Sequence, residues 1–152
     1  MDKGRSGFAI HLLALAAVGI ADASYDSYAI YVGQALWCPP PIDGCNVVAA
    51  SPYAYLLGLP VGYFGLGYYL CMFALATLLA FAPRSGLLRW ATILGAAVGV
   101  CFSLYFMRVQ LAFIHAFCIY CIISAALTVL LLIAAVAHYR ATRPPSGHTA
   151  TA

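Results

Sequence analysis

The sequence predicts an all-α membrane protein: a bundle of four transmembrane helices, with an outer loop and a short membrane-lying helix that caps one end. Two observations carry this prediction. Of the 152 residues, 65% are hydrophobic and only 7% are charged, and the apolar residues gather in runs near the roughly 20 residues that cross a bilayer. A soluble domain of this size cannot hide so much apolar surface. The net charge of +3 is too small and too scattered to predict binding to nucleic acid.

Four apolar runs define the spans of a single transmembrane domain, residues 1–139. The spans are expected at about 8–30, 61–82, 88–110 and 117–139. The first run is too long for the core of a signal peptide and no convincing A-x-A cleavage site follows it, so it is expected to stay as a span. Pro60, flanked by Gly58 and Gly62, separates the second span from the apolar residues before it.

The connection between the first two spans, residues 31–60, is expected to lie outside the bilayer. Its second half, Cys45 to Leu59, is predicted to form one short helix that lies on the membrane surface or dips into it. Residues 140–152 are polar and contain proline, so they are predicted to form a disordered cytoplasmic tail.

Basic residues beside the spans predict how the chain crosses the membrane. They lie at the two ends of the chain and at the turn between the second and third spans: Lys3, Arg5, Arg84, Arg89, Arg140 and Arg143. Four spans place all of them on one side, which the positive-inside rule makes cytoplasmic together with both termini. Aromatic residues are expected to form a belt at the outer face: Tyr25, Tyr28, Tyr31, Trp37 and Tyr53.

The cysteines separate into an outer group and a deep pair. The outer group combines two residues of the loop with two at the start of the fourth span: Cys38, Cys45, Cys118 and Cys121. At 1.5 Å per residue from Arg140, Cys118 lies about 33 Å up the fourth span and Cys121 about 28 Å, at and just inside the outer boundary. Cys71 and Cys101 lie about 18–20 Å deep, where free cysteine is expected to pack as a small apolar residue.

Cys118 and Cys121 form a C-x-x-C motif, "CIYC", whose sulfur atoms fall on one face of a helix. At the start of a span, exposed N–H groups and the helix dipole favour a thiolate, which His115 is expected to help stabilise. Two alternatives to a redox pair are two small packing residues and, together with the loop cysteines, a zinc site. The C-x6-C spacing of the loop is wide for zinc, so no metal is expected.

Cys38 and Cys45 flank the stretch "PPPIDG", whose prolines stiffen the loop and hold the first thiol in water. A static structural disulfide is the simplest alternative. The outer face is oxidising, so disulfides persist there. Two pairs side by side favour exchange, because a thiolate of one pair can attack the disulfide of the other. Electrons would then pass inward, from water at the loop to a carrier dissolved in lipid.

Three further polar residues lie near the outer end. Asp26 is expected to face water at the interface. Asp22 is deeper, about 25 Å from Arg5, where a carboxylate is costly unless it is paired; a structural partner inside the bundle is expected, with a proton relay as the alternative. Ser51 precedes Pro52 and is expected to cap a helix or to donate a hydrogen bond to a ligand carbonyl.

Three stretches together resemble the vitamin K epoxide reductase family: the C-x6-C loop, "CNVVAASPYAYLLGLPVGYFGLGYYL" with its serine six residues after the second loop cysteine, and "FIHAFCIYCIISA". The resemblance covers the whole chain except the tail. It implies a four-helix bundle around a quinone at the outer end. The site residues that it implies are the active pair Cys118 and Cys121, the loop pair Cys38 and Cys45, and Ser51 in the quinone pocket.

The resemblance also implies a direction. Bacterial-type members oxidise a thioredoxin-like (DsbA-like) protein and pass the electrons to a quinone, whereas animal members reduce vitamin K epoxide. Many bacterial relatives carry a fused thioredoxin-like domain; this chain ends in a short tail, so a separate partner is expected. Animal enzymes contact vitamin K through an Asn in the second span and a Tyr four residues after the active pair. Val61 or its neighbours and Ala125 occupy these regions here, which favours a respiratory quinone. The other four-span disulfide-forming family has its C-x-x-C in the first outer loop, the reverse of the order here.

These observations predict a quinone-dependent thiol–disulfide oxidoreductase in a bacterial inner membrane, with the active site at the outer face. The expected partners are membrane lipid, a ubiquinone, menaquinone or vitamin K type quinone, and a thioredoxin-like protein. Cys38 is expected to exchange with the protein partner and Cys45 to carry electrons to Cys118, with Cys38 as the alternative shuttle. Cys121 is expected to react with the quinone. Two other functions stay open: a vitamin K or vitamin K epoxide reductase, and a non-catalytic membrane scaffold held by structural disulfides.

Overall fold

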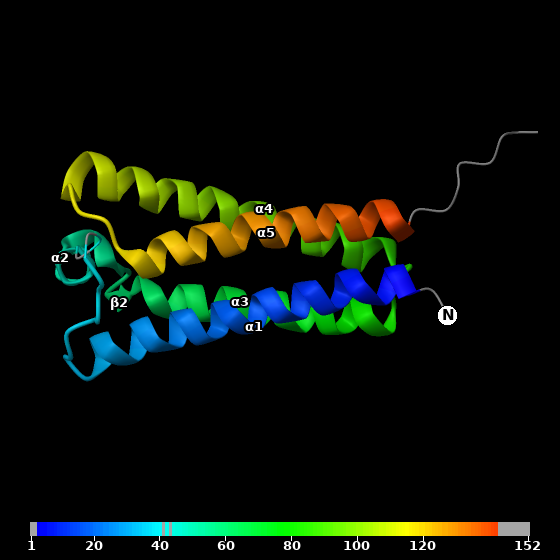
Figure 1. The fold of residues 1–152 in the computed structure, drawn as a ribbon, viewed down its shortest axis with the longest axis horizontal. Coiled ribbons are helices and arrows are strands. Elements are labelled where there is room, and N and C mark those ends of the chain that lie inside the picture. The colour runs from blue at the N-terminus through cyan, green and yellow to red at the C-terminus, as the bar shows by residue number, and fades with distance from the viewer. Residues whose placement is uncertain (1–2, 41, 43, 143–152) are drawn as a thin grey trace, which may run out of the picture.

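The computed structural model describes residues 3–40, 42 and 44–142, and four long helices run side by side within them (Figure 1). They are α1 (Lys3–Tyr31), α3 (Val61–Phe81), α4 (Gly86–Val109) and α5 (Ile119–Thr142). Each is long and apolar enough to cross a membrane, where a helix satisfies its own backbone hydrogen bonds. The predicted class, an all-α membrane bundle, is confirmed.

The helices extend beyond the predicted spans at several places. α1 begins at Lys3 rather than near residue 8. α4 continues into a π-helical turn, η2 (Gln110–Ile114), instead of ending at residue 110. α5 runs to Thr142, so residues 140–142 are helical and the prediction that the tail begins at residue 140 is wrong. The rest of that predicted tail lies outside the described residues.

Small residues let the helices approach closely. α1 packs against α3 and α5, and α4 packs against α5. The ring of Tyr69 on α3 occupies the space that a side chain at Gly19 of α1 would need, and the Tyr68 ring lies in the same way against Gly99 of α4. Close contacts of this kind drive helix association in lipid, where apolar burial alone gives no preference for protein over acyl chains.

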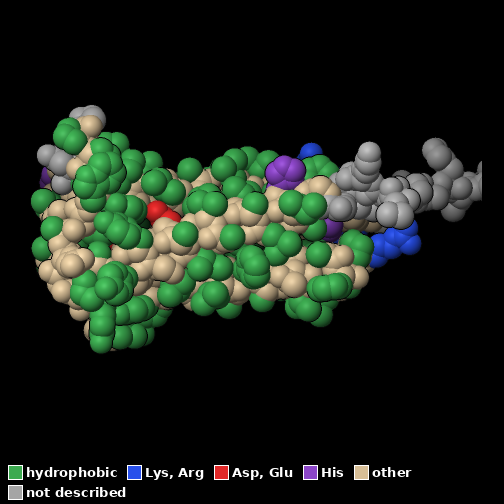
Figure 2. Space-filling view, turned by 60° about the horizontal axis from the view of Figure 1, so that its bottom comes forward, with side chains coloured by type: hydrophobic (Ala, Val, Ile, Leu, Met, Phe, Trp, Pro, Cys, Tyr) green, Lys and Arg blue, Asp and Glu red, His purple; other side chains and the backbone are tan. Residues whose placement is uncertain are grey.

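The outside of the bundle is largely apolar, as Figure 2 shows for one face. Cys71 on α3 and Cys101 on α4 lie on this exposed surface, so the prediction that they pack inside the protein is wrong. The helical period is the reason, because α3 turns its neighbours Tyr69 and Met72 toward the core, which leaves Cys71 on the outside. Both deep thiols therefore face the lipid side of their helices.

The loop between α1 and α3 folds into a cap over one end of the bundle. It contains α2 (Cys45–Ala49), a 3-10 turn η1 (Pro52–Ala54), and an antiparallel hairpin of β1 (Tyr55–Leu56) and β2 (Leu59–Pro60). The predicted single helix from Cys45 to Leu59 is therefore wrong. Pro52 lacks a backbone donor, and Leu57 and Gly58 both take positive φ, 54° and 81°, as the central residues of a tight hairpin turn do.

The cap lies at the end of the bundle opposite to the start of α1 and the end of α5 (Figure 1), as an even number of helices requires. Residues predicted for the outer aromatic belt are exposed: Tyr25, Tyr28, Tyr31, Trp37 and Tyr53. The assignment of the capped end to the outer face stays a prediction from the basic residues.

Candidate active site

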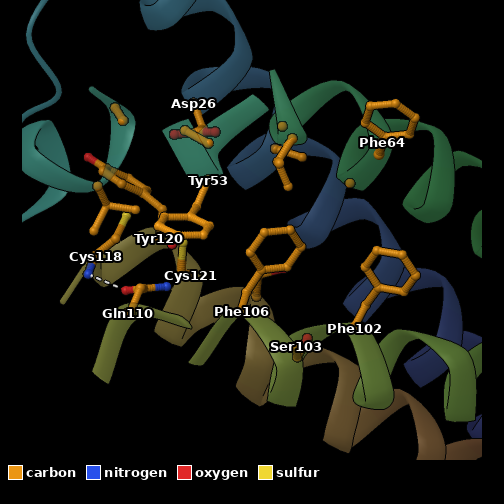
Figure 3. Close-up of a pocket in the computed structure, with 18 of the residues that line it drawn as sticks. Asp26, Tyr53, Phe64, Phe102, Ser103, Phe106, Gln110, Cys118, Tyr120 and Cys121 are labelled. Atoms are coloured by element: carbon orange, nitrogen blue, oxygen red, sulfur yellow. Dashed lines mark hydrogen bonds between the residues drawn. The ribbon is translucent and has the colours of Figure 1, made fainter. Parts of the chain in front are cut away.

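A cavity of about 290 Å³ lies between the helices beneath the cap. Residues from α1, α3, α4, α5 and the cap line it, and most of its walls are apolar: Ile30, Val61, Phe64, Phe102, Phe106 and Val109. Polar groups gather where the cap meets the helices (Figure 3): Asp26, Gln110, Cys118, Tyr120 and Cys121. The volume is close to the lower end of the range of about 300–1,000 Å³ that is common for small-molecule sites, and the apolar lining is also typical of them.

Cys118 and Cys121 meet at this cavity, at the start of α5 (Figure 3). Cys118 comes directly before the helix, and its carbonyl accepts the Ile122 N–H at 3.1 Å. Its side chain is only 2% exposed, whereas Cys121, one helical turn further, is half-buried. Both are free thiols. The helical spacing predicted from the C-x-x-C motif therefore places both sulfur atoms beside one pocket.

The pKa of the Cys118 thiol is lowered from its ordinary value, chiefly because the Cys121 side chain hydrogen-bonds to it. Backbone groups of Cys121 and Tyr120 add to this effect, since N–H groups point out of the start of a helix. Burial and the Asp26 carboxylate oppose it. His115, predicted to stabilise the thiolate, is instead exposed and takes the left-handed conformation, with φ 55°, that ends η2.

Cys38 and Cys45 form a disulfide, with their Cα atoms 6.2 Å apart. Cys45 is fully buried and packs in one apolar cluster with Cys118, whereas Cys38 is half-buried. Gly44 makes this approach possible, because a Cβ at its position would stand 2.7 Å from the carbonyl oxygen of Phe117. The loop pair thus lies against the start of α5, with its buried sulfur beside the active pair.

Two polar side chains that the sequence analysis missed hold the loop in this place. Asn46 exchanges two hydrogen bonds with the Leu36 backbone: the Leu36 N–H donates to Oδ1 at 2.8 Å, and Nδ2 donates to the Leu36 carbonyl at 3.1 Å. The Tyr120 hydroxyl donates to the Trp37 carbonyl at 2.6 Å. The only sequence signal for these roles is position, since Asn46 follows Cys45 and Tyr120 lies within the C-x-x-C motif.

Gln110, which the sequence analysis also missed, is the first residue of η2 and only 1% exposed. Its Oε1 accepts the Cys118 N–H at 2.8 Å, the bond drawn as a dashed line in Figure 3. Its Nε2 is buried and has no hydrogen-bond partner among the described residues. A polar residue inside an apolar run was the available signal, because such residues are rare in membrane spans and often functional.

Ser51 and the two aspartates line the same cavity, although three predictions about them need correction. Ser51 stands at the N-cap position of η1, but its hydroxyl donates to the Val48 carbonyl at 2.7 Å and makes no capping bond to the turn that follows. Asp26 lies at the cavity rather than facing interfacial water (Figure 3). The predicted structural partner of Asp22 is absent from the described residues.

Comparison with known families extends these observations. A family model described as the vitamin K epoxide reductase family matches residues 10–136. The matched range contains both cysteine pairs and every residue that lines the cavity. The similarity therefore covers most of the chain, including the cap, all of α3 and α4, and most of α1 and α5.

Proposed function

Because the chain belongs to the vitamin K epoxide reductase family, we propose that it is a quinone-linked thiol–disulfide oxidoreductase that forms disulfides outside the cytoplasm. The family implies a membrane oxidoreductase, and its members use quinones in general. One observation carries the proposal: the sulfur atoms follow one another inward. Half-exposed Cys38 is bonded to buried Cys45, Cys45 packs with Cys118, and Cys121 lies beside the apolar cavity.

The cavity residues fit a quinone. Aromatic and aliphatic walls, among them Phe102 and Phe106, suit a flat ring with an apolar tail, and polar groups at the cap end suit its oxygen atoms. Ser51 lies at that end; its hydroxyl hydrogen is engaged with Val48, so it has to rotate to donate to a ligand. A bound quinone supplies an acceptor for two electrons and two protons.

The first step is exchange with a protein partner. A thiolate of a reduced thioredoxin-like protein attacks Cys38, the more exposed sulfur of the loop disulfide, and Cys45 leaves as a thiolate. The second thiol of the partner then attacks the mixed disulfide and releases Cys38. The partner gains a disulfide, and the loop pair holds its two electrons.

The second step passes the electrons inward. The Cys45 thiolate attacks Cys118 of a Cys118–Cys121 disulfide, and Cys121 leaves as a thiolate. Cys38 then attacks Cys45, which re-forms the loop disulfide and leaves Cys118 and Cys121 reduced. The observed combination, a loop disulfide beside two free thiols, corresponds to the state after this step.

The last step returns the active pair to its disulfide. Both thiols line the cavity, and Cys121 is assigned the contact with the quinone because it lies one helical turn beyond Cys118, which packs in the buried cluster with Cys45. The S–S bond between them forms as the pair gives two electrons and two protons to the quinone. The lowered pKa of Cys118 favours this closure, because a thiolate is the attacking species in disulfide formation.

Quinol formation tests the proposal. Purified protein, given a soluble ubiquinone or menaquinone analogue and a reduced thioredoxin-like protein, is expected to form one quinol for each disulfide made in the partner. Cys118→Ser and Cys121→Ser should each abolish it. The double variant Cys71→Ala Cys101→Ala is the matched control and should retain it, because both thiols are on the outside of the bundle.

Two outcomes would favour the other functions. Reduction of vitamin K epoxide without oxidation of a protein partner would identify an epoxide reductase. No quinol with any thiol donor, together with a loop disulfide that no partner reduces, would favour the scaffold. Under the proposal the capped end lies outside the cytoplasm, in a bacterial inner membrane.

A further inference from the structure

We propose that Gln110 is the hydrogen-bond donor for the thiolate that forms at Cys121 when the loop passes its electrons inward. The inference rests on the proposed function and deepens it. One end of the Gln110 amide is fixed, because Oε1 accepts the Cys118 N–H at 2.8 Å. The other end, Nε2, is buried without a partner among the described residues, and Figure 3 places it toward Cys121.

The orientation of the amide follows from its bond to Cys118. The Cys118 N–H lies at the start of α5, where backbone donors have no partner within the helix. Turned over, the Gln110 amide would bring its own N–H groups against this donor and leave both unpaired. The nitrogen end must therefore lie on the side of Cys121. Since Gln110 is 1% exposed, bulk water does not reach it.

The backbone between the two residues is built to make this contact. Gln110 begins the π-helical turn η2, and His115 then turns the chain through the left-handed region, with φ 55°. This reversal brings the backbone N–H of Cys118 to the side chain of Gln110, eight residues earlier in the sequence. π-helical turns are rare and frequently occur at functional sites, and an unpaired buried donor in a native fold requires an explanation.

The exchange reaction supplies an acceptor for that donor. When Cys45 attacks Cys118, the Cys118–Cys121 bond breaks and Cys121 leaves with the electron pair as a thiolate. This charge forms beside an apolar cavity that Asp26 also lines, where an anion without a donor is costly. An N–H of Gln110 stabilises the leaving thiolate without protonating it, which assists the attack and keeps the electron pair available for the quinone.

Other titratable groups line the cavity around Cys121 from each neighbouring element. They are Asp22 and Asp26 of α1, Cys45 of α2, Tyr53 of η1, Tyr68 and Tyr69 of α3, Cys118 directly before α5, and Tyr120 of α5. An ionised carboxylate opposes a thiolate, and Cys45 is held in the loop disulfide. The Tyr120 hydroxyl donates to Trp37 and the Tyr69 hydroxyl bonds to Ser124, so neither is free for Cys121.

Titration of a single thiol tests the inference without a quinone. Cys71→Ala, Cys101→Ala and Cys118→Ser leave Cys121 as the free thiol, while the loop pair stays in its disulfide. The rate at which a small haloacetamide alkylates Cys121 is measured against pH. Gln110→Met keeps the length of the side chain but removes the amide. It is expected to raise the pH midpoint by about one unit, a loss of about tenfold in rate below the midpoint.

Three comparisons make the result specific. Thr92→Val removes a buried hydroxyl of α4 that, among the described residues, donates to the Leu88 carbonyl of its own helix, and it should leave the midpoint unchanged. Gln110→Leu repeats the test should the methionine variant fail to fold. In a second background, Cys121→Ser together with Cys38→Ser and Cys45→Ser leaves Cys118 as a free thiol with no loop disulfide to attack, and there Gln110→Met should move the midpoint by much less than about one unit.

Two results would overturn the role of Gln110. One is an unchanged Cys121 midpoint. The other is an equal shift at Cys118 and Cys121, since that would mean that Gln110 only holds the start of α5. The proposed function is tested apart from this, by quinol formation in the unsubstituted protein. No shift with intact quinol formation contradicts the Gln110 donor alone, and a shift in a protein that forms no quinol contradicts the proposed function alone.

Discussion

Replacing Gly44 with alanine should slow electron transfer from the loop pair to Cys118 without affecting the reaction of the Cys118–Cys121 pair itself. Gly44 directly precedes Cys45 and lies against the chain that leads into α5. An added Cβ would stand 2.7 Å from the Phe117 carbonyl oxygen, 2.8 Å from the Phe117 nitrogen and 2.9 Å from the Ala116 Cβ. Two of these are backbone atoms, which cannot swing aside as the end of a flexible side chain can. The loop must therefore move away from α5.

The size of the movement follows from the contact. A Cβ in ordinary contact stays at least 3.4 Å from its neighbours, and 3.4 minus 2.7 gives a displacement of 0.7 Å. A misplacement near 1 Å can cost a reaction about 100-fold, so transfer from Cys45 to Cys118 should slow by about 10- to 100-fold. Overpacking of this kind costs about 1–3 kcal/mol, which leaves the bundle folded.

Two electron donors distinguish the halves of the route. Electrons from a reduced thioredoxin-like protein pass through the loop pair, so the rate of turnover with this donor should fall by about 10- to 100-fold. Turnover with a small dithiol that reduces the Cys118–Cys121 pair directly should stay at the wild-type rate. Gly67→Ala is the matched control, because a Cβ there meets nothing within 4 Å. A Gly44→Ala protein that turns over normally with the protein donor would refute the need for close contact between loop and α5.

Three further predictions concern topology, the outer loop thiol and pH. Reporter fusions after Ala152 and within residues 39–44 should report opposite sides of the membrane; the same side for both would exclude four spans with cytoplasmic ends. Cys38→Ala should abolish oxidation of the protein partner yet leave a small dithiol able to reduce the Cys118–Cys121 pair, and oxidation of the partner at the wild-type rate would mean that another thiol receives the electrons. In a protein with Cys38→Ser and Cys45→Ser, where Cys118 has no loop disulfide to attack, Cys121→Ala should raise the pKa of Cys118, because it removes the side chain whose hydrogen bond lowers that pKa. The alkylation rate of Cys118 should then fall off at a higher pH than in the same protein with Cys121 present, and an unchanged midpoint would contradict the assigned cause.

The spans were predictable because the bilayer imposes a length and an apolar composition on any helix that crosses it. The cap was not, since a short apolar stretch is compatible with a helix or a strand. Leu57 and Gly58 both take the left-handed conformation, which forms the hairpin turn. A leucine rarely takes this conformation, so the sequence does not predict the turn. The outward position of Cys71 and Cys101 depends on the rotation of each helix, which depth along the span does not determine.

The sulfur atoms of the candidate site could be found from spacing, but their neighbours could not. A C-x-x-C motif at a helix start places two thiols on one face whatever the tertiary fold. Asn46 acts through two hydrogen bonds to the Leu36 backbone and Gln110 through one to Cys118, and a lone polar residue leaves no periodic pattern. The Gln110 contact further depends on a π-helical turn and a left-handed residue, which are features of the backbone rather than of composition.

Trapping the exchange intermediate tests the inward route of electrons most directly. In a Cys121→Ser variant, the Cys118 thiolate can attack the loop disulfide but cannot close its own. The account predicts a Cys45–Cys118 disulfide with Cys38 as the released thiol, seen by peptide mapping after acid quenching and alkylation. A Cys38–Cys118 disulfide, or a Cys118 that stays a free thiol beside an intact loop disulfide, would contradict the route from Cys45 to the active pair.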